Sequence, residues 1–202
     1  MKSTLSAALS LAALFCTSLT AGCVAPVGPV EVTRFHVPEA ESAPRAEIAV
    51  EPAAGMDGQS LEYRSYAVAV GSELQRLGYA RIAAPGTGAQ VALVRVARET
   101  IEPERAGGPV SVGLGGTAGS HGSGVGLGIG VNLSPPPPAM VRTTLSVTIR
   151  ERAANRALWE GRASFTVKAS SPMADTQLGA PKLAEALFRG WPGQSGETIL
   201  VP

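Results

Sequence analysis

The chain has 202 residues, enough for one domain or two small ones. Hydrophobic residues make up 45% of it, which is enough to build a core, while charged residues reach only 16%. With 17 Lys and Arg against 16 Asp and Glu, the formal net charge is +1, so the chain offers no basic field for nucleic acid. The 2 Cys and 2 His weaken most metal-site and catalytic interpretations.

The N-terminus has the pattern of an export signal. Lys2 supplies a positive charge, and an apolar run over residues 5–15 follows it. This run is too short to span a bilayer, which takes about 20 residues, and it fits the apolar part of a secretory signal peptide. We therefore predict a signal peptide over residues 1–22.

The residues around Cys23 resemble the bacterial lipobox. Small residues precede this cysteine, and Thr20 stands where leucine is most usual. The resemblance implies cleavage between Gly22 and Cys23, followed by acylation of the cysteine. Cleavage would also remove Cys16, so that the mature chain could form no internal disulfide. The alternative is an ordinary signal peptide with a chance cysteine.

Residues 23–29 are rich in Pro and Gly and suit a short tether between the membrane and a domain over residues 30–202. Acyl chains on Cys23 would anchor the chain stably. By resemblance to Gram-negative lipoproteins, Val24 in place of Asp implies sorting to the outer membrane. We expect a single periplasm-facing domain.

The first half of this domain alternates strands and a helix. Strands are predicted over 30–35, 46–51 and 90–98, because β-formers and alternating apolar residues fill these segments. Between the second and third, Ser60 can cap a helix that runs to about Leu77. Its apolar stripe follows the 3.6-residue period and comprises Tyr63, Tyr66, Ala67, Val70, Leu74 and Leu77.

Glycine dominates residues 107–133, where two alternating arms flank a small-residue tip. The pattern predicts a β-hairpin, ended by the proline run 135–138. We favour a hairpin that extends the domain's own sheet with its apolar face on the core. The alternative is insertion into a membrane or a multimeric barrel, although lipid does not tolerate the unpaired edges of a lone hairpin.

The second half predicts an antiparallel pair of strands over 141–150 and 159–167, then a helix over 181–189 with Pro181 in its first turn. The tail after residue 193 can add a short extended piece. Strands grouped with two helices predict an α+β fold, with a mostly antiparallel sheet, two helices on one face and the glycine-rich hairpin.

Four segments resemble the bacterial envelope lipoproteins called domain of unknown function family 4136. They are residues 60–79, 110–133, 145–163 and 183–199. The resemblance covers most of residues 32–199. It implies a periplasm-facing lipoprotein and brings no known activity.

The sequence contains only weak motifs for cofactor binding, metal binding or catalysis. Residues 113–118 match a dinucleotide-binding glycine pattern, but more glycine follows and the acidic partner is missing, so we predict no cofactor. His36 and His121 are too few for a metal site, and His121 fits a solvated turn. We therefore predict no metal site, no catalytic residues and no enzymatic activity, with a hydrolase as the least favoured function.

Arg150, Arg152 and Arg156 cluster at one predicted turn. They could contact lipid phosphate, which arginine recognises well, although a solvated loop with Glu151 as neighbour is the favoured interpretation. The function predicted is a non-catalytic interaction or scaffold module of the envelope, whose partner is another envelope protein or a second copy. The alternative is a lipid or hydrophobic-ligand binding protein.

Overall fold

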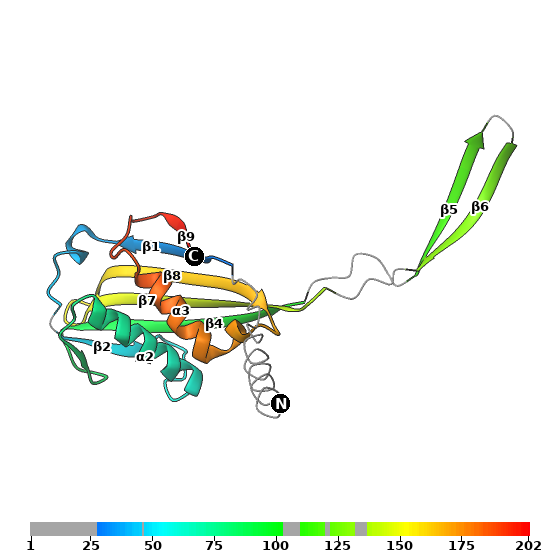
Figure 1. The fold of residues 1–202 in the computed structure, drawn as a ribbon. Helices are drawn as coiled ribbons and strands as arrows, with labels where there is room; N and C mark the ends of the chain where they lie inside the picture. Colours follow the sequence, from blue (N-terminus) through cyan, green and yellow to red (C-terminus); the bar gives the residue numbers. More distant parts are fainter. Residues whose placement is uncertain (1–27, 46, 103–109, 120–121, 132–136) are drawn as a thin grey trace, which may run out of the picture.

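The described residues form a seven-stranded sheet with two helices on one face, together with a separate pair of strands (Figure 1). In the computed structural model, residues 28–45, 47–102, 110–119, 122–131 and 137–202 are described. The elements in chain order are β1 (Val30–His36), β2 (Glu47–Pro52), α2 (Leu61–Arg76), β3 (Arg81–Ala83), β4 (Gln90–Ile101), β5 (Val110–Gly119), β6 (Gly122–Val131), β7 (Met140–Glu151), β8 (Arg156–Lys168), α3 (Thr176–Phe188) and β9 (Thr198–Val201). The predicted α+β class is confirmed.

The sheet is mixed, which corrects the prediction of a mostly antiparallel one. Its order is β3-β2-β4-β7-β8-β1-β9, and β2 pairs in parallel with both β3 and β4. The physical reason is α2, which carries the chain back across the sheet so that the strands after it run in the direction of β2. The short strand β3 was not predicted.

Helix α2 begins where the sequence predicts. The Ser60 hydroxyl accepts a hydrogen bond from the Tyr63 amide at 3.1 Å, which caps the helix. Just beyond its end, Gly78 has a φ of +98°, a left-handed conformation that favours glycine. The side that faces the sheet is the predicted stripe, of which Tyr63, Tyr66, Val70 and Leu74 are buried.

Helix α3 begins at Thr176, so the predicted start at Pro181 is wrong. The reason is Asp175, whose carboxylate accepts a hydrogen bond from the Gln177 amide at 2.8 Å and caps an earlier first turn. Pro181 therefore lies inside the helix, on its exposed side. Neither described helix is long and apolar enough to cross a bilayer.

The glycine-rich strands β5 and β6 pair antiparallel with each other, in a two-stranded sheet separate from the seven-stranded one. Before and after them in the chain, β4 and β7 pair along twelve residues each. The glycine-rich segment is thus an insertion between two neighbouring strands. In the described residues it does not extend the main sheet, so that expectation is wrong. Residues 103–109, 120–121 and 132–136 lie outside the described residues.

Aromatic side chains join the end of α3 to β8. The ring of Trp159 stacks on Phe188 at 5.3 Å and lies 4.6 Å from the ring of Trp191, measured between centroids. Its indole N–H donates to the Pro192 carbonyl at 3.0 Å. Gly161 leaves room for the ring, because a Cβ there would lie 2.2 Å from a ring carbon of Trp159.

Candidate functional site

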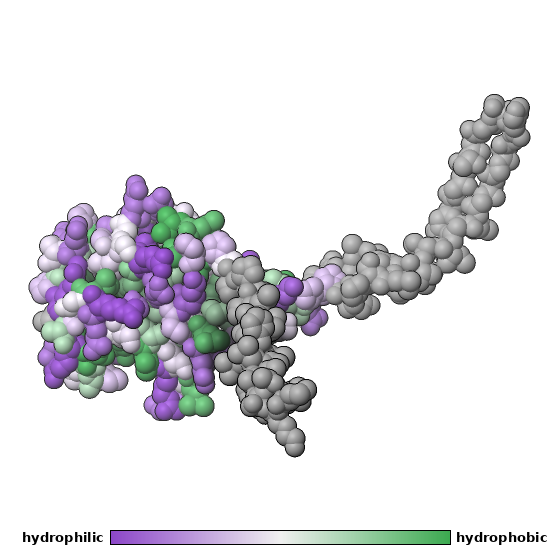
Figure 2. Space-filling view, viewed as in Figure 1, coloured by the Kyte–Doolittle hydropathy of each residue, from purple (hydrophilic) through white to green (hydrophobic). Residues whose placement is uncertain are grey.

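A groove of about 820 Å³ runs along the outer side of the two helices. On α2 its lining residues recur every three or four positions, and on α3 every four, so each set lies on one helix face. They include Leu61, Ser65, Val68 and Ser72 of α2, and Gln177, Pro181 and Glu185 of α3. Figure 2 shows this side of the molecule, with hydrophobic residues (green) scattered among hydrophilic ones (purple).

Two large apolar side chains of this groove face solvent. Leu61 is 77% exposed and Val68 is 70% exposed. The neighbouring Ser65, Ala69 and Ser72 are small, which leaves a trough beside the two apolar side chains. Covering a leucine or valine side chain fully would gain about 1.5–3 kcal/mol, so this groove favours a partner that removes both from water.

The rim of the groove is charged. Arg76 pairs with Glu73 at 2.7 Å on α2, and Glu185 of α3 pairs with Arg189. An apolar centre with a polar rim is the usual anatomy of a protein–protein contact surface. These exposed pairs contribute little to stability by themselves.

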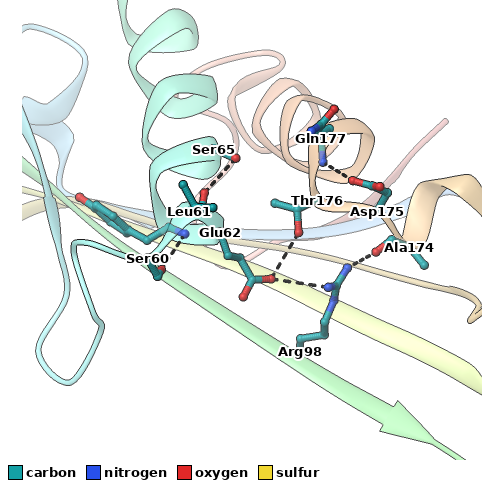
Figure 3. A network of polar contacts seen from close by, with 10 residues as sticks. Ser60, Leu61, Glu62, Ser65, Arg98, Ala174, Asp175, Thr176 and Gln177 are labelled. Carbon is teal, nitrogen blue, oxygen red and sulfur yellow. Dashed lines mark hydrogen bonds and ion pairs between the residues drawn. The ribbon is translucent and has the colours of Figure 1, made fainter.

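At one end of the groove, a polar network joins the starts of both helices to β4 (Figure 3). Arg98 of β4 lies 3.7 Å from the Glu62 carboxylate and also donates to the Ala174 carbonyl. The Thr176 hydroxyl donates to the same carboxylate at 3.5 Å. The network thus connects the first turns of both helices to the same strand of the sheet.

Two buried hydroxyls lie close to this network in the fold. Tyr66 is fully buried on α2, and Thr143 stands opposite Arg98 in the register of β4 and β7. Neither hydroxyl has a hydrogen-bond partner among the described residues. Burial raises the pKa of Tyr66 to about 12, an effect that Arg98 opposes and Glu62 reinforces. The phenol therefore stays protonated at neutral pH.

The other side of the sheet, away from the helices, is polar; we call it the open face. It consists of the residues of β1, β4, β7 and β8 that alternate with the buried ones. Its members are Glu31, Thr33, Phe35, Leu93, Arg95, Ala97, Glu99, Arg142, Thr144, Ser146, Thr148, Arg150, Glu160, Arg162, Ser164, Thr166 and Lys168. Hydroxyls and guanidinium groups thus lie side by side across neighbouring strands.

The three arginines predicted at the turn serve different contacts. Arg152 donates to the Glu51 carboxylate at 2.6 Å and to two loop carbonyls, and Arg156 pairs with Glu151 at 3.1 Å. Arg150 donates to the side-chain oxygen of Asn155 at 3.1 Å. Although burial pushes the pKa of Glu51 up, the Gly86 amide and Arg152 hold it below its ordinary value. Of the three, Arg150 is the one that belongs to the open face.

Of the other predicted site residues, only His36 lies in the described part of the chain. Gly22, Cys23 and His121 lie outside the described residues. The two ring nitrogens of His36 lie 3.0 Å and 3.1 Å from the carbonyls of Val37 and Gly193, which positions the tail against β1. Within the described ranges, no group of three or more His, Cys, Asp or Glu could hold a metal ion.

Comparison with known protein families finds no match. One curated relative is an uncharacterized protein of Zymomonas mobilis, 36% identical over 58 residues. The alignment covers 29% of this chain and 22% of that protein.

Two solved structures share part of the shape. A PelC dodecamer from Paraburkholderia phytofirmans is 11% identical, with 77% of this chain and 91% of that chain covered and a TM-score of 0.42. A PDZ domain protein from Parabacteroides distasonis is 10% identical, with 86% and 39% covered and a TM-score of 0.46. Neither likeness is close enough to assign a function.

Sequence reasoning missed the exposed residues of the groove and one buried cation. Leu61 and Val68 could have been found as apolar residues on the polar side of the predicted helix. Arg34 is 4% exposed and donates to the carbonyls of Leu187 and Ala186 at the end of α3, at 2.9 and 3.0 Å. No local sequence pattern predicts this role of Arg34, because its partners are more than 150 residues away.

Proposed function

We propose that the chain is an acylated envelope lipoprotein with a non-catalytic interaction module over residues 30–202. The anchor is Cys23, exposed as the new N-terminus by cleavage after Gly22, and the module faces the periplasm from the outer membrane. The export signal and the lipobox-like motif support this address. Membership of family 4136 is part of the same proposal.

The observation that carries the interaction role is the groove between α2 and α3. Leu61 and Val68 are exposed there beside small residues, and ion pairs flank them. A surface of this kind gains free energy when a partner covers it. The partner is another envelope protein or a second copy of the chain.

The main competing function, a lipid or hydrophobic-ligand binder, needs a cavity between the helices and the sheet. Tyr66, Leu74 and Leu187 lie in that layer and are fully buried in the core. The packing of this layer therefore favours the interaction role.

Photo-crosslinking in intact cells tests the groove directly. A photoreactive phenylalanine at Val68 should give a specific crosslinked product, because that position is 70% exposed within the groove. The matched control is the same residue at Gln75, which is exposed on the same helix outside the groove. No product from Val68, or equal products from both positions, would contradict the proposal.

Native mass spectrometry of the chain extracted in mild detergent separates the other possibilities. The intact mass reports acylation of Cys23, and a stoichiometric partner or a defined oligomer supports the interaction role. A monomer that carries a discrete small adduct favours the ligand-binding function instead. A bare, unmodified monomer would count against both the anchor and the module.

A further inference from the structure

Ten of the arginines that the structure describes fall into two groups. In the described part of the chain, six form ion pairs with carboxylates: Arg76, Arg81, Arg98, Arg152, Arg156 and Arg189. Two of the six, Arg81 and Arg152, flank the open face and pair there with Glu47 and Glu51 of β2. Of the four arginines of the open face, Arg95, Arg150 and Arg162 instead lie among hydroxyl, carbonyl and amide groups, while Arg142 stands opposite Glu99 in register.

Their positions in the sheet form a regular array. Arg162 of β8 lies between Thr33 and Ser146 in register, and Ser146 lies opposite Arg95 of β4. One row across four strands therefore reads hydroxyl, guanidinium, hydroxyl, guanidinium. Arg142 lies on β7, four residues before Ser146, and donates to the Thr166 hydroxyl at 3.3 Å. Both group types donate hydrogen bonds to phosphate oxygens.

The charge of the open face is positive on balance. Its cations are Arg95, Arg142, Arg150, Arg162 and Lys168, and its carboxylates are Glu31, Glu99 and Glu160. On the neighbouring strand β2, Glu47 and Glu51 are each already paired with an arginine. An anionic partner therefore meets more cations than carboxylates here.

The same face also exposes apolar side chains at one edge. Phe35 of β1 is 54% exposed, and Leu200 of β9 is 66% exposed and stands opposite Glu31 in register. Apolar side chains next to cations are typical of surfaces that lie in the headgroup layer of a membrane. They distinguish a lipid surface from a nucleic acid or a polysaccharide, which would not reward an exposed leucine.

We infer that the open face is a docking surface for the anionic headgroups of the membrane that holds the chain. The inference rests on the proposed function, because the anchor at Cys23 brings the face to the bilayer. Six residues separate this anchor from β1, so Cys23 and Val30 can lie at most about 25 Å apart. With the open face on the membrane, the groove between α2 and α3 points toward the periplasm, where a partner can reach it.

Thiol accessibility on reconstituted full-length protein tests this orientation. Ser146→Cys places a thiol in the middle of the arginine array, and Gln75→Cys places one on the exposed side of α2, outside the groove. The acylated variants are placed in vesicles of phosphatidylcholine, with or without phosphatidylglycerol, and labelled with a water-soluble maleimide. Phosphatidylglycerol should slow labelling of Ser146→Cys several-fold and leave Gln75→Cys unchanged.

Charge reversal tests whether the arginines cause the slower labelling of Ser146→Cys. Arg95→Glu with Arg162→Glu should restore fast labelling, since each arginine near an anionic surface contributes a factor of about five to binding. The matched control is Gln75→Glu with Lys182→Glu on the helix side, outside the groove, which should keep the protection. High salt should restore fast labelling of the otherwise unmodified Ser146→Cys protein, a test that does not depend on how the charge-reversed protein folds.

Three outcomes would overturn the inference. Equal labelling in both vesicle types would show that the lipid charge is not recognised. Protection in detergent without lipid would show that a second copy covers the face. Protection that survives both charge reversal and high salt would exclude an electrostatic contact.

Two separate measurements test the anchor: intact mass shows whether the chain is acylated, and flotation with phosphatidylcholine vesicles shows whether it attaches to a membrane. If the chain proves not to be acylated, salt-sensitive flotation with phosphatidylglycerol vesicles tests the face instead. Loss of that flotation in the Arg95→Glu and Arg162→Glu variant would support the inference, and no flotation of the unaltered chain would overturn it.

Discussion

The two faces of the sheet are built from the same strands, but one face packs in the core and the other is a polar surface. On the helix side, Val94, Val147 and Gly161 are buried in a row, while the residues beside them in the chain point to the open face. A strand alternates its side chains with a period of two, so one segment can supply both a core and a polar surface. Substitutions on the helix side should therefore affect folding, and those on the open face should affect binding.

The largest effect should come from Gly161→Ala. A Cβ at this position would lie 2.2 Å from Trp159 and 2.8 Å from Leu187, so the core must shift, at a cost of about 3 kcal/mol. The urea midpoint measures this. Ser164→Ala, on the open face of the same strand, is the control and should change stability by less than about 0.5 kcal/mol. An unchanged midpoint for Gly161→Ala would show that the two faces tolerate substitution equally.

Arg34→Met should cost about 2 kcal/mol of unfolding free energy, because the last carbonyls of α3 lose their charged donor while still buried. Burial lowers the pKa of Arg34, an effect that Glu197 opposes. The matched variant Arg162→Met on the open face should leave stability within about 0.5 kcal/mol. Equal losses in chemical denaturation would contradict the division between the faces.

Two tyrosines on the helix side test how much a hydrogen bond contributes to a buried hydroxyl. Tyr79→Phe should cost about 1 kcal/mol, because its hydroxyl donates to the Gln90 side chain at 2.7 Å. Tyr66→Phe should be neutral or slightly stabilising, because its buried hydroxyl has no partner among the described residues. If Tyr66→Phe costs as much as Tyr79→Phe, an ordered water or another group must satisfy the Tyr66 hydroxyl.

The smallest effect concerns Glu51 at the margin of the sheet. Its pKa is lowered in the folded state, so its contribution is present above its ordinary value of 4.5 and is lost as the pH falls through the lowered value. Glu51→Gln should thus reduce stability at neutral pH by less than about 1 kcal/mol, and the difference should vanish in acid. Denaturation midpoints at several pH values measure it. Arg152→Gln should remove most of the same pH-dependent difference, and its persistence would assign the effect to the Gly86 amide.

Much of the fold could be predicted from local sequence. Ser60 and Gly78 set the limits of α2, and the alternation in β7 and β8 predicted both strands, because caps and side-chain periods act over a few residues. The parallel pairing of β2 was missed, since strand direction depends on where the helix crosses. The start of α3 was predicted at Pro181, but the Asp175 cap begins the helix at Thr176.

The candidate surfaces were predicted less well. The cluster of Arg150, Arg152 and Arg156 was visible in the sequence, but the sheet separates Arg150 from the two that pair with carboxylates. No local pattern predicted that Arg95 and Arg162 would share a surface, because these two residues are more than 60 positions apart in the chain.

The sequence by itself determined most of the strands and the capped helix α2, and it predicts the export signal and the lipobox-like motif, because each depends on neighbours within a few positions. Only the tertiary structure decided the mixed sheet, the groove between α2 and α3, and the array of arginines on the open face. The reason is that these features arise where segments distant in the chain pack side by side, and their register follows from burying one face of every strand at once.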